Sequence, residues 1–355
     1  MHLPPCYRRH LGSGTPCLTA VLAICLLALI PTAASADPPS ALESLTGRTL
    51  GGMQFWADEL LFRGWRIQRN TVDDHCRLLD AENVRHGDGT FEQCRAKLEE
   101  IKRRQQLPPM RGHVVLVLHG LFRTRNSMAG LCEYLRRQGG LTVLDVGYPS
   151  TRRDVAGHAR SLASIVDHLG DVESISFVGH SMGNIVVRHY LADRARREAG
   201  RDRPAGQSID PVPKQPKLYR FVMLAPPNHG SLAAFALEDN NALKAITGSA
   251  VQQLGVDWAR LEGRLATPDF PFGIIAGGKS DGSGYNPLLI GDDDGTVAVS
   301  TTRLAGAADF VVVPALHSFC MNDDKVRQYT LRFLQRGYFI SPQQRHPIPA
   351  NPPTR

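Results

Sequence analysis

The chain has 355 residues, of which 42% are hydrophobic and 21% charged, with 33 glycines and 24 prolines. This composition excludes a fibrous repeat, a largely disordered chain and a small disulfide-dense protein. The formal net charge is +7 at pH 7, but basic and acidic residues are interspersed, so the charge favours solubility over a nucleic-acid partner. We therefore expect one large globular domain with additions and no binding of nucleic acid.

Residues 1–36 have the order of a secretory signal peptide. Two arginines, Arg8 and Arg9, precede the apolar run 18–30, and the small-residue site Ala34-Ser35-Ala36 follows it. The apolar run is short for a membrane span. We expect cleavage after Ala36 and a periplasmic or secreted protein, with an uncleaved N-terminal anchor as the alternative.

The expected export indicates how the cysteines should be interpreted. Four cysteines lie outside the signal segment, and they are Cys76, Cys94, Cys132 and Cys320. Cys76 and Cys94 share one polar segment and are predicted to form a disulfide in an oxidising compartment. Cys132 and Cys320 lie in apolar surroundings and are expected as buried thiols. The cysteine spacing is not that of a zinc site, and no metal is expected.

Residues 37–110 are predicted to form an N-terminal extension that ends in the linker 107–109. The segment Met53–Leu61 has the pattern of a short amphipathic helix, and Trp65–Gln68 that of a strand. Phe91–Arg104 has a period near 3.6 and predicts a charged helix. Nothing in this extension indicates a function.

From residue 111 to 338, apolar runs typical of buried strands alternate with helical patterns. The strands are expected at 113–118, 141–146, 174–178, 218–224, 272–276 and 310–313, and the helices at 154–169, 184–197 and 323–336. This alternation predicts an α/β domain with a mainly parallel sheet flanked by helices. The remaining segments are read as a surface loop at 198–217, a helical cap within 231–271 and a flexible C-terminal tail at 339–355.

The pentapeptide 179–183 has the sequence GHSMG and stands between a predicted strand and a predicted helix. This is the G-x-S-x-G pattern in the strand–turn–helix setting that it requires. The turn is too tight for side chains at the glycine positions, and it pushes the serine hydroxyl outward. Ser181 is therefore the candidate nucleophile, rather than part of an ordinary glycine-rich turn.

A serine hydroxyl is a weak nucleophile until a base takes its proton. His317 follows the last predicted strand, where the base of such a sheet is expected, although an ordinary loop histidine is the alternative. The aspartates 292–294 lie between the strand 272–276 and His317, which gives the chain order Ser, Asp, His. A calcium-binding loop is the alternative for these aspartates, but its ligands would need alternate positions and more acids downstream.

An oxyanion hole requires backbone N–H groups aimed at the developing negative charge. The N–H of Met182 follows the nucleophile at a helix start, and the loop 119–122 after the first strand is expected to supply a second donor, Leu121. Phe122 and Met182, with Leu232 and Phe235, are candidates for an apolar acyl wall, although core packing would use the same residues.

These motifs resemble those of α/β-hydrolases of the lipase and esterase kind over residues 111–338. The matching pieces are Leu118-His119-Gly120-Leu121, the pentapeptide 179–183, Asp294-Gly295-Thr296-Val297, Leu316-His317-Ser318 and the loop 227–231, where Asn228 is inserted into a P-H-x-G-S pattern. The resemblance implies an α/β-hydrolase fold, a triad of Ser181, Asp294 and His317, a hydrolysed ester and no organic cofactor. In the family pattern the acid directly precedes the glycine of D-G-x-V, which favours Asp294 and leaves Asp293 as runner-up. His229 is expected in the wall of the substrate site, with a structural role.

The sequence therefore predicts an exported serine hydrolase that cleaves small-molecule or lipid esters and makes transient contact with lipid surfaces. The same triad would equally serve an acyltransferase, a thioesterase or an amidase, because the acyl-enzyme accepts different nucleophiles. A non-catalytic exported binding protein is the third reading, and the presence of every triad residue type weighs against it.

Overall fold

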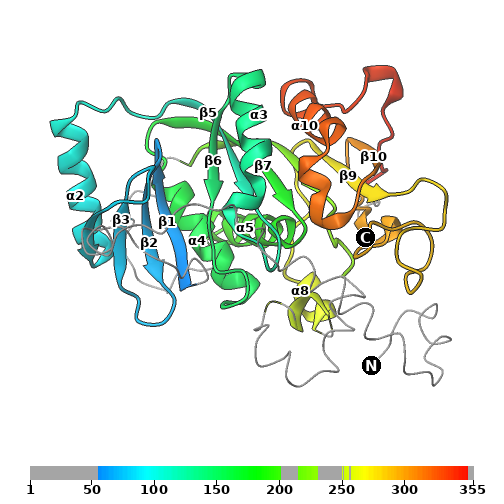
Figure 1. Cartoon of the computed structure of the whole chain (residues 1–355), viewed down its shortest axis with the longest axis horizontal. Helices are drawn as coiled ribbons and strands as arrows, with labels where there is room; N and C mark the ends of the chain where they lie inside the picture. Colours follow the sequence, from blue (N-terminus) through cyan, green and yellow to red (C-terminus); the bar gives the residue numbers. More distant parts are fainter. Residues whose placement is uncertain (1–54, 201–214, 231–249, 251, 256, 351–355) are drawn as a thin grey trace, which may run out of the picture. The chain divides into compact units, whose positions relative to one another are not determined.

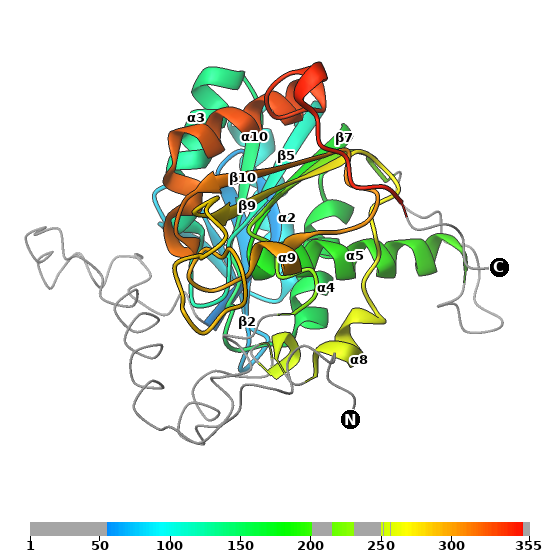
Figure 2. The ribbon, with the colours of Figure 1, turned by 90° about the vertical axis from the view of Figure 1, so that its right-hand side faces the viewer.

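A computed structural model describes residues 55–200, 215–230, 250, 252–255 and 257–350, and Figures 1 and 2 show its ribbon. Its centre is a six-stranded sheet with the order β10-β9-β8-β7-β5-β6, in which every pair of neighbours is parallel. The strands are β5 (Gly112–Leu118), β6 (Thr142–Val146), β7 (Val172–His180), β8 (Lys217–Leu224), β9 (Phe272–Gly278) and β10 (Asp309–Pro314). All six predicted strands and the α/β architecture are confirmed.

Helices cover both faces of this sheet. On β5, Val114 and Leu116 are buried against α4 (Val155–Asp167) and α5 (Met182–Glu198), while Val115 and Val117 are buried on the opposite face. That opposite face is covered by α3 (Ala129–Gly139) and α10 (Asp324–Arg336) (Figure 1). Burial on both faces explains why the strands read as continuous apolar runs. Of the four helices, only α3 was not predicted, and it begins without a capping side chain.

The strand order creates a switch point between β5 and β7. From β5 the chain crosses to β6 on one side, and it then returns to β7 on the other side. In open parallel sheets, ligands bind at the carboxyl ends of the strands at such a point. The predicted loop 119–122 follows β5 and Ser181 follows β7, so the topology brings the two to the same edge.

The N-terminal extension forms a second, antiparallel sheet followed by a helix. Its elements are β1 (Trp56–Phe62), β2 (Trp65–Asn70), β3 (Cys76–Leu79), β4 (Arg85–Gly89) and α2 (Phe91–Arg104). The predicted strand at 65–68 and helix at 91–104 are confirmed, and a capping box between Thr90 and Gln93 starts α2. The predicted helix over 53–61 is wrong for its described part, which forms β1. A tight turn at Arg63 and Gly64 pairs β1 with β2, and this pairing overrides the local helical pattern.

Asp58 on β1 ties the extension to the catalytic sheet. Its buried carboxylate accepts hydrogen bonds from the Gly147 N–H at 2.6 Å and from the Gln68 side-chain amide at 2.7 Å. The Asp58 N–H also donates to the Gly147 carbonyl at 2.9 Å. Burial raises the pKa of Asp58, while the positive charges of Arg125 and Arg66 and these hydrogen bonds stabilise its charged form. The extension thereby supports the loop that connects β6 to α4.

The predicted disulfide between Cys76 and Cys94 is not formed. Both residues are free thiols, buried in the apolar core that the extension shares with α4. Burial raises the pKa of Cys94 to about 11, which disfavours the thiolate that disulfide exchange requires. Cys132 and Cys320 are also buried thiols, as predicted.

The expectation of a flexible tail from residue 339 does not hold as far as residue 350. Phe339 is fully buried and its ring lies 4.9 Å from that of Phe333 on α10. The Asp309 carboxylate at the start of β10 accepts hydrogen bonds from the N–H groups of Phe339 and His346, at 2.8 and 2.9 Å. Prolines alone suggested a loose chain, but a buried ring and a buried acid anchor this segment.

Several predictions fall outside the described residues. They are the signal segment 1–36, most of the surface loop 198–217 and much of the cap, from which the described part holds α8 (Trp258–Glu262). The domain boundaries stay predictions. None of the helices within the described ranges combines the length and the apolarity that crossing a membrane requires.

Buried histidines lie beneath the end of β5. His158 on α4 packs against Tyr148, with ring centroids 4.8 Å apart, and Tyr148 stacks on His119 at 4.1 Å. Burial lowers the pKa of His158 to about 3 and that of His119 to about 4. Both side chains are therefore neutral in the folded protein at neutral and mildly acidic pH.

This burial predicts a pH dependence of stability. In the unfolded chain these histidines titrate near pH 6.5, so below that pH the unfolded state binds protons that the folded state does not. The free energy of unfolding should therefore fall as the pH falls below 6.5, by about 1.4 kcal/mol per pH unit for each such histidine. For His158→Leu, the free energy of unfolding, measured with denaturant at pH values between 6 and 4, should fall less steeply with decreasing pH, by about 1.4 kcal/mol per pH unit.

Ser164→Ala on α4, which removes no titratable group, provides the control and should keep the wild-type pH dependence. An unchanged slope in His158→Leu would contradict the burial of a neutral imidazole at position 158.

Candidate active site

Ser181 occupies the sharp turn between β7 and α5. Its backbone has φ 52° and ψ −123°, a conformation that L-residues rarely adopt. The Ser181 N–H donates to the Leu224 carbonyl at 2.9 Å, and the Asn184 amide donates to the Ser181 carbonyl at 3.0 Å and to the Leu224 carbonyl at 3.1 Å. These bonds hold the strained turn against β8 and direct the serine hydroxyl away from the sheet.

The last glycine of the pentapeptide is required by close packing. A Cβ at Gly183 would lie 2.8 Å from the carbonyl oxygens of both Leu118 and His119 at the end of β5. The start of α5 therefore rests directly on the β5 backbone. On the other side, a Cβ at Gly120 would lie 3.0 Å from the Ser181 Cβ. The loop after β5 and the serine are thus in contact.

His317 begins the short helix η5 (His317–Asn322) after β10. Its Nε2 lies 2.9 Å from the Ser181 Oγ, although 136 residues separate the two in sequence. The His317 N–H donates to the Asp294 carbonyl at 2.8 Å, which fixes the histidine backbone to the aspartate loop. The imidazole is largely buried, with 11% of its side chain exposed.

Asp294 lies on the other side of His317 from Ser181, so the three side chains form a hydrogen-bonded row. Its Oδ2 lies 2.7 Å from the His317 Nδ1, and its Oδ1 accepts from the N–H groups of Thr296 and Val297 at 3.0 and 2.7 Å. Because a carboxylate only accepts, the Nδ1 carries the proton, and the Nε2 of the neutral ring is left to accept from the serine hydroxyl. Gly295, with φ 93°, allows the turn directly after the acid.

The other two aspartates of the run hold loops. The Asp293 carboxylate accepts from the N–H groups of Tyr285, Asn286 and Gly295, and that of Asp292 accepts from those of Lys279 and Ser280. The Asp293 side chain is fully buried. Backbone N–H donors offset the cost of burying it.

Tyr148 and His119 fix the loop that holds the candidate oxyanion donor Leu121. The Tyr148 hydroxyl donates to the His119 carbonyl, and the His119 Nδ1 donates to the Gly120 carbonyl at 2.9 Å. Next along the chain, Phe122 has φ 56° and is partly buried. Met182, the other candidate donor, is the first residue of α5 and is fully buried. The sequence carried no signal for the part that Tyr148 takes here.

His180 packs beside His317. Its Nε2 donates to the His317 carbonyl at 3.0 Å, and the two ring centroids lie 5.0 Å apart. Burial lowers the pKa of His180 well below its usual value. The ring is therefore neutral and acts as a donor that holds the His317 backbone.

His229 is held in place by contacts with Glu262 and Thr301. Its Nδ1 lies 3.1 Å from a Glu262 carboxylate oxygen, and its N–H donates to the Thr301 carbonyl. The preceding residue, Asn228, accepts from the buried Arg188 guanidinium at 3.1 Å and donates to the Thr302 carbonyl at 2.8 Å. These contacts join His229 to neighbouring loops, and among its described contacts none is with the triad. Within the described ranges, no cluster of three His, Cys, Asp or Glu side chains is arranged to hold a metal.

Comparison with known proteins adds a family match. Residues 110–251, which include Ser181 but not Asp294 or His317, match the family model described as "Putative serine esterase (DUF676)". No curated protein matches the chain.

Solved structures with a similar chain course include several lipolytic enzymes. A gene product of Listeria innocua is 15% identical over 68% of this chain and 99% of its own, with a TM-score of 0.44. The phospholipase PlaB of Legionella pneumophila is 17% identical over 63% of this chain and 60% of its own, with a TM-score of 0.44. The lipase of Staphylococcus hyicus is 13% identical over 60% of this chain and 89% of its own, with a TM-score of 0.41. These similarities are too distant to carry a conclusion about substrate.

The parallel six-stranded sheet, the serine at its switch point and the serine-esterase match lead to one conclusion. The chain has the α/β-hydrolase fold and is a serine hydrolase of the lipase and esterase type.

Proposed function

We propose that this protein is an exported carboxylic ester hydrolase that forms an acyl-enzyme on Ser181. The observation that supports this most directly is the hydrogen-bonded row from the Asp294 carboxylate through the His317 imidazole to the Ser181 hydroxyl. Export rests on the sequence of residues 1–36 alone.

In the proposed reaction, the Ser181 Oγ attacks the ester carbonyl while the His317 Nε2 takes its proton. Asp294 stabilises the imidazolium that forms. As the tetrahedral intermediate collapses, the ester C–O bond breaks, and the imidazolium gives its proton to the leaving alcohol. A water molecule then attacks the acyl-enzyme, and His317 takes its proton. When the second tetrahedral intermediate collapses, the imidazolium returns this proton to the Ser181 Oγ and the carboxylic acid is released.

The negative oxygen of the tetrahedral intermediate needs donors on the other side of the serine. The N–H of Met182 is available because it belongs to the first turn of α5, whose N–H groups have no partner within the helix. Leu121 follows Gly120, whose backbone contacts the Ser181 side chain. We assign the two oxyanion donors to these residues.

Apolar side chains beside His317 favour an ester with an apolar acyl group. Leu316, directly before the base in sequence, is 44% exposed, and Phe319, two residues after it, is 57% exposed. Large exposed apolar side chains next to a reactive group mark a surface that receives an apolar ligand. We therefore propose fatty-acyl esters, including lipids at a lipid–water surface, as the substrate class.

Replacing Ser181 by alanine tests the nucleophile. We expect Ser181→Ala to lower kcat on a nitrophenyl ester by about 10³-fold or more, because only binding and the oxyanion donors remain. A fluorophosphonate probe should label Ser181 in the wild type and leave the variant unlabelled, as read by peptide mass spectrometry. The control Ser164→Ala, on α4, should behave as the wild type in both assays. A tenth of the activity surviving in Ser181→Ala would refute the assignment.

Measuring both activity and melting temperature distinguishes the roles of the three aspartates. Asp294→Asn should lower kcat by about 10³–10⁴-fold with little change in melting, because the amide favours the wrong tautomer of His317. Asp293→Asn should lower the melting temperature, because a buried carboxylate that accepts three N–H groups is replaced. Asp292→Asn should change kcat by less than about tenfold. If Asp293→Asn removed activity without affecting melting while Asp294→Asn kept it, the acid would be Asp293.

Acyl-chain preference tests the apolar surface. Phe319→Ser should lower kcat/KM for an octanoyl ester by about tenfold, since part of a phenyl contact is lost, and should leave the acetyl ester unchanged. Val72→Ser is the matched control, because Val72 is 79% exposed in the turn between β2 and β3. Equal effects of Phe319→Ser on both esters would contradict an acyl contact at this side chain.

A further inference from the structure

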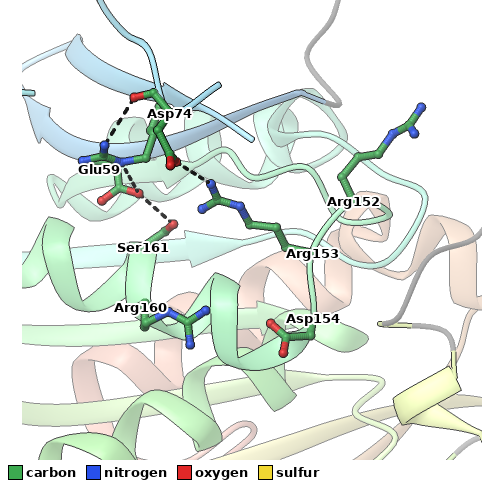
Figure 3. A pocket seen from close by; sticks show the side chains of 8 residues that line it. Glu59, Asp74, Arg152, Arg153, Asp154, Arg160 and Ser161 are labelled. Atoms are coloured by element: carbon green, nitrogen blue, oxygen red, sulfur yellow. Dashed lines mark hydrogen bonds and ion pairs between the residues drawn. The ribbon is translucent and has the colours of Figure 1, made fainter. Parts of the chain in front are cut away.

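A polar cavity of about 570 Å³ lies on the outer side of α4, and its lining includes no triad residue. Figure 3 shows the side chains that line it. They come from the N-terminal sheet, from the loop before α4 and from α4 itself, and they are Glu59, Arg69, Asp74, Arg152, Arg153, Asp154, Arg160 and Ser161. The lining therefore includes four arginines and three carboxylates. All eight side chains are polar, so the cavity is suited to a charged ligand rather than an acyl chain.

Two of the three carboxylates, those of Glu59 and Asp154, already have partners within the protein. Glu59 is largely buried, accepts from the Ser161 hydroxyl at 3.1 Å and lies 3.7 Å from the Arg69 guanidinium. Asp154 caps α4 by accepting from the Gly157 N–H at 2.7 Å. These interactions satisfy the two acids within the protein, so they compete weakly for the remaining guanidinium groups.

Two arginines of the lining, Arg153 and Arg160, are poorly neutralised. Arg160 points into the open space between Ser161 and Asp154 (Figure 3), and it pairs with no carboxylate in the described part of the chain. Arg153 faces only Asp74, at 3.8 Å, and the Asp74 side chain is 79% exposed. Such a long, exposed ion pair contributes little stability. Arg152 extends away from the other charged groups, with its guanidinium over the Phe55 ring.

We propose that this cavity binds a phosphate group through Arg153 and Arg160. A guanidinium matches the oxygens of phosphate with paired N–H donors, and a phosphate would displace the weak partner Asp74 from Arg153. The volume exceeds that of a bare ion and leaves room for an esterified phosphate. Free phosphate and the phosphate of a lipid headgroup share this chemistry.

The cavity is linked to the active site through one loop. The Ser150 hydroxyl donates to the Arg123 carbonyl at 3.4 Å, and the Arg123 guanidinium donates to the carbonyl of Ser318, next to the triad histidine, at 3.4 Å. Ser150 precedes Arg152 and Arg153 in the same loop. A phosphate bound there thus lies at the end of a chain of contacts that begins beside His317.

Calorimetric titration of the full chain with inorganic phosphate, at constant ionic strength, tests the site. We expect saturable binding that Arg153→Gln and Arg160→Gln each weaken about tenfold. Asp74→Asn should strengthen binding, because it removes the competing carboxylate. The control is Arg137→Gln, which removes a 77% exposed guanidinium on α3 and should leave the affinity unchanged.

Three results would overturn the proposal: no saturable binding, equal affinities in Arg160→Gln and Arg137→Gln, or a loss of affinity in Asp74→Asn. The last would mean that the cluster is only a structural ion-pair network. Ser181→Ala should bind phosphate as the wild type does, so failure of the proposed hydrolase mechanism would leave this readout intact.

Hydrolysis assays distinguish the two sources of phosphate, and this arm rests on the proposed ester hydrolysis. If the ligand is a headgroup, Arg160→Gln should lower the rate on phosphatidylglycerol vesicles about tenfold and spare a soluble nitrophenyl ester. If the ligand is free phosphate, the variant should hydrolyse both substrates like the wild type while its affinity for phosphate falls about tenfold. Either pattern supports the site and names its ligand.

Discussion

The close approach of α5 to the end of β5 is the constraint on which the active-site geometry depends. It exists only because residue 183 has no side chain, since a Cβ there would lie 2.8 Å from two β5 carbonyl oxygens. This contact places the first turn of α5 and the loop 119–122 on either side of Ser181. The strained serine backbone is held by hydrogen bonds from Asn184 on α5 and to Leu224 on β8, which belong to regular elements rather than to loops.

Single buried polar side chains fix the loops that carry the rest of the site. Asp293 holds the segment before the candidate acid, Asn228 joins the 226–230 loop to Arg188 and Thr302, and Asp309 fastens residues 339–346. Asp58 does the same for the N-terminal sheet. Each group satisfies N–H donors that would otherwise be buried without a partner, so irregular segments keep one conformation without regular secondary structure.

The buried histidines of the catalytic domain add no charge beside His317. His119, His158 and His180 are buried, and burial lowers the pKa of each, so they are neutral where the enzyme is expected to work. A charged His180, 5.0 Å from His317, would oppose the imidazolium that forms during acyl transfer.

The sequence by itself determined the parallel sheet, because strands buried on both faces leave unbroken apolar runs, and it marked Ser181 through two glycines that a tight turn requires. It also predicted that Asp294 and His317 follow the strands that the structure has as β9 and β10. Only the tertiary structure decided that the three side chains form one hydrogen-bonded row, since residues over a hundred positions apart meet through the strand order. The β1 hairpin, the free Cys76 and Cys94, and the burial of Asp293 and Phe339 were also decided there. Each depends on a partner from a distant segment, and local pattern carries no information about such partners.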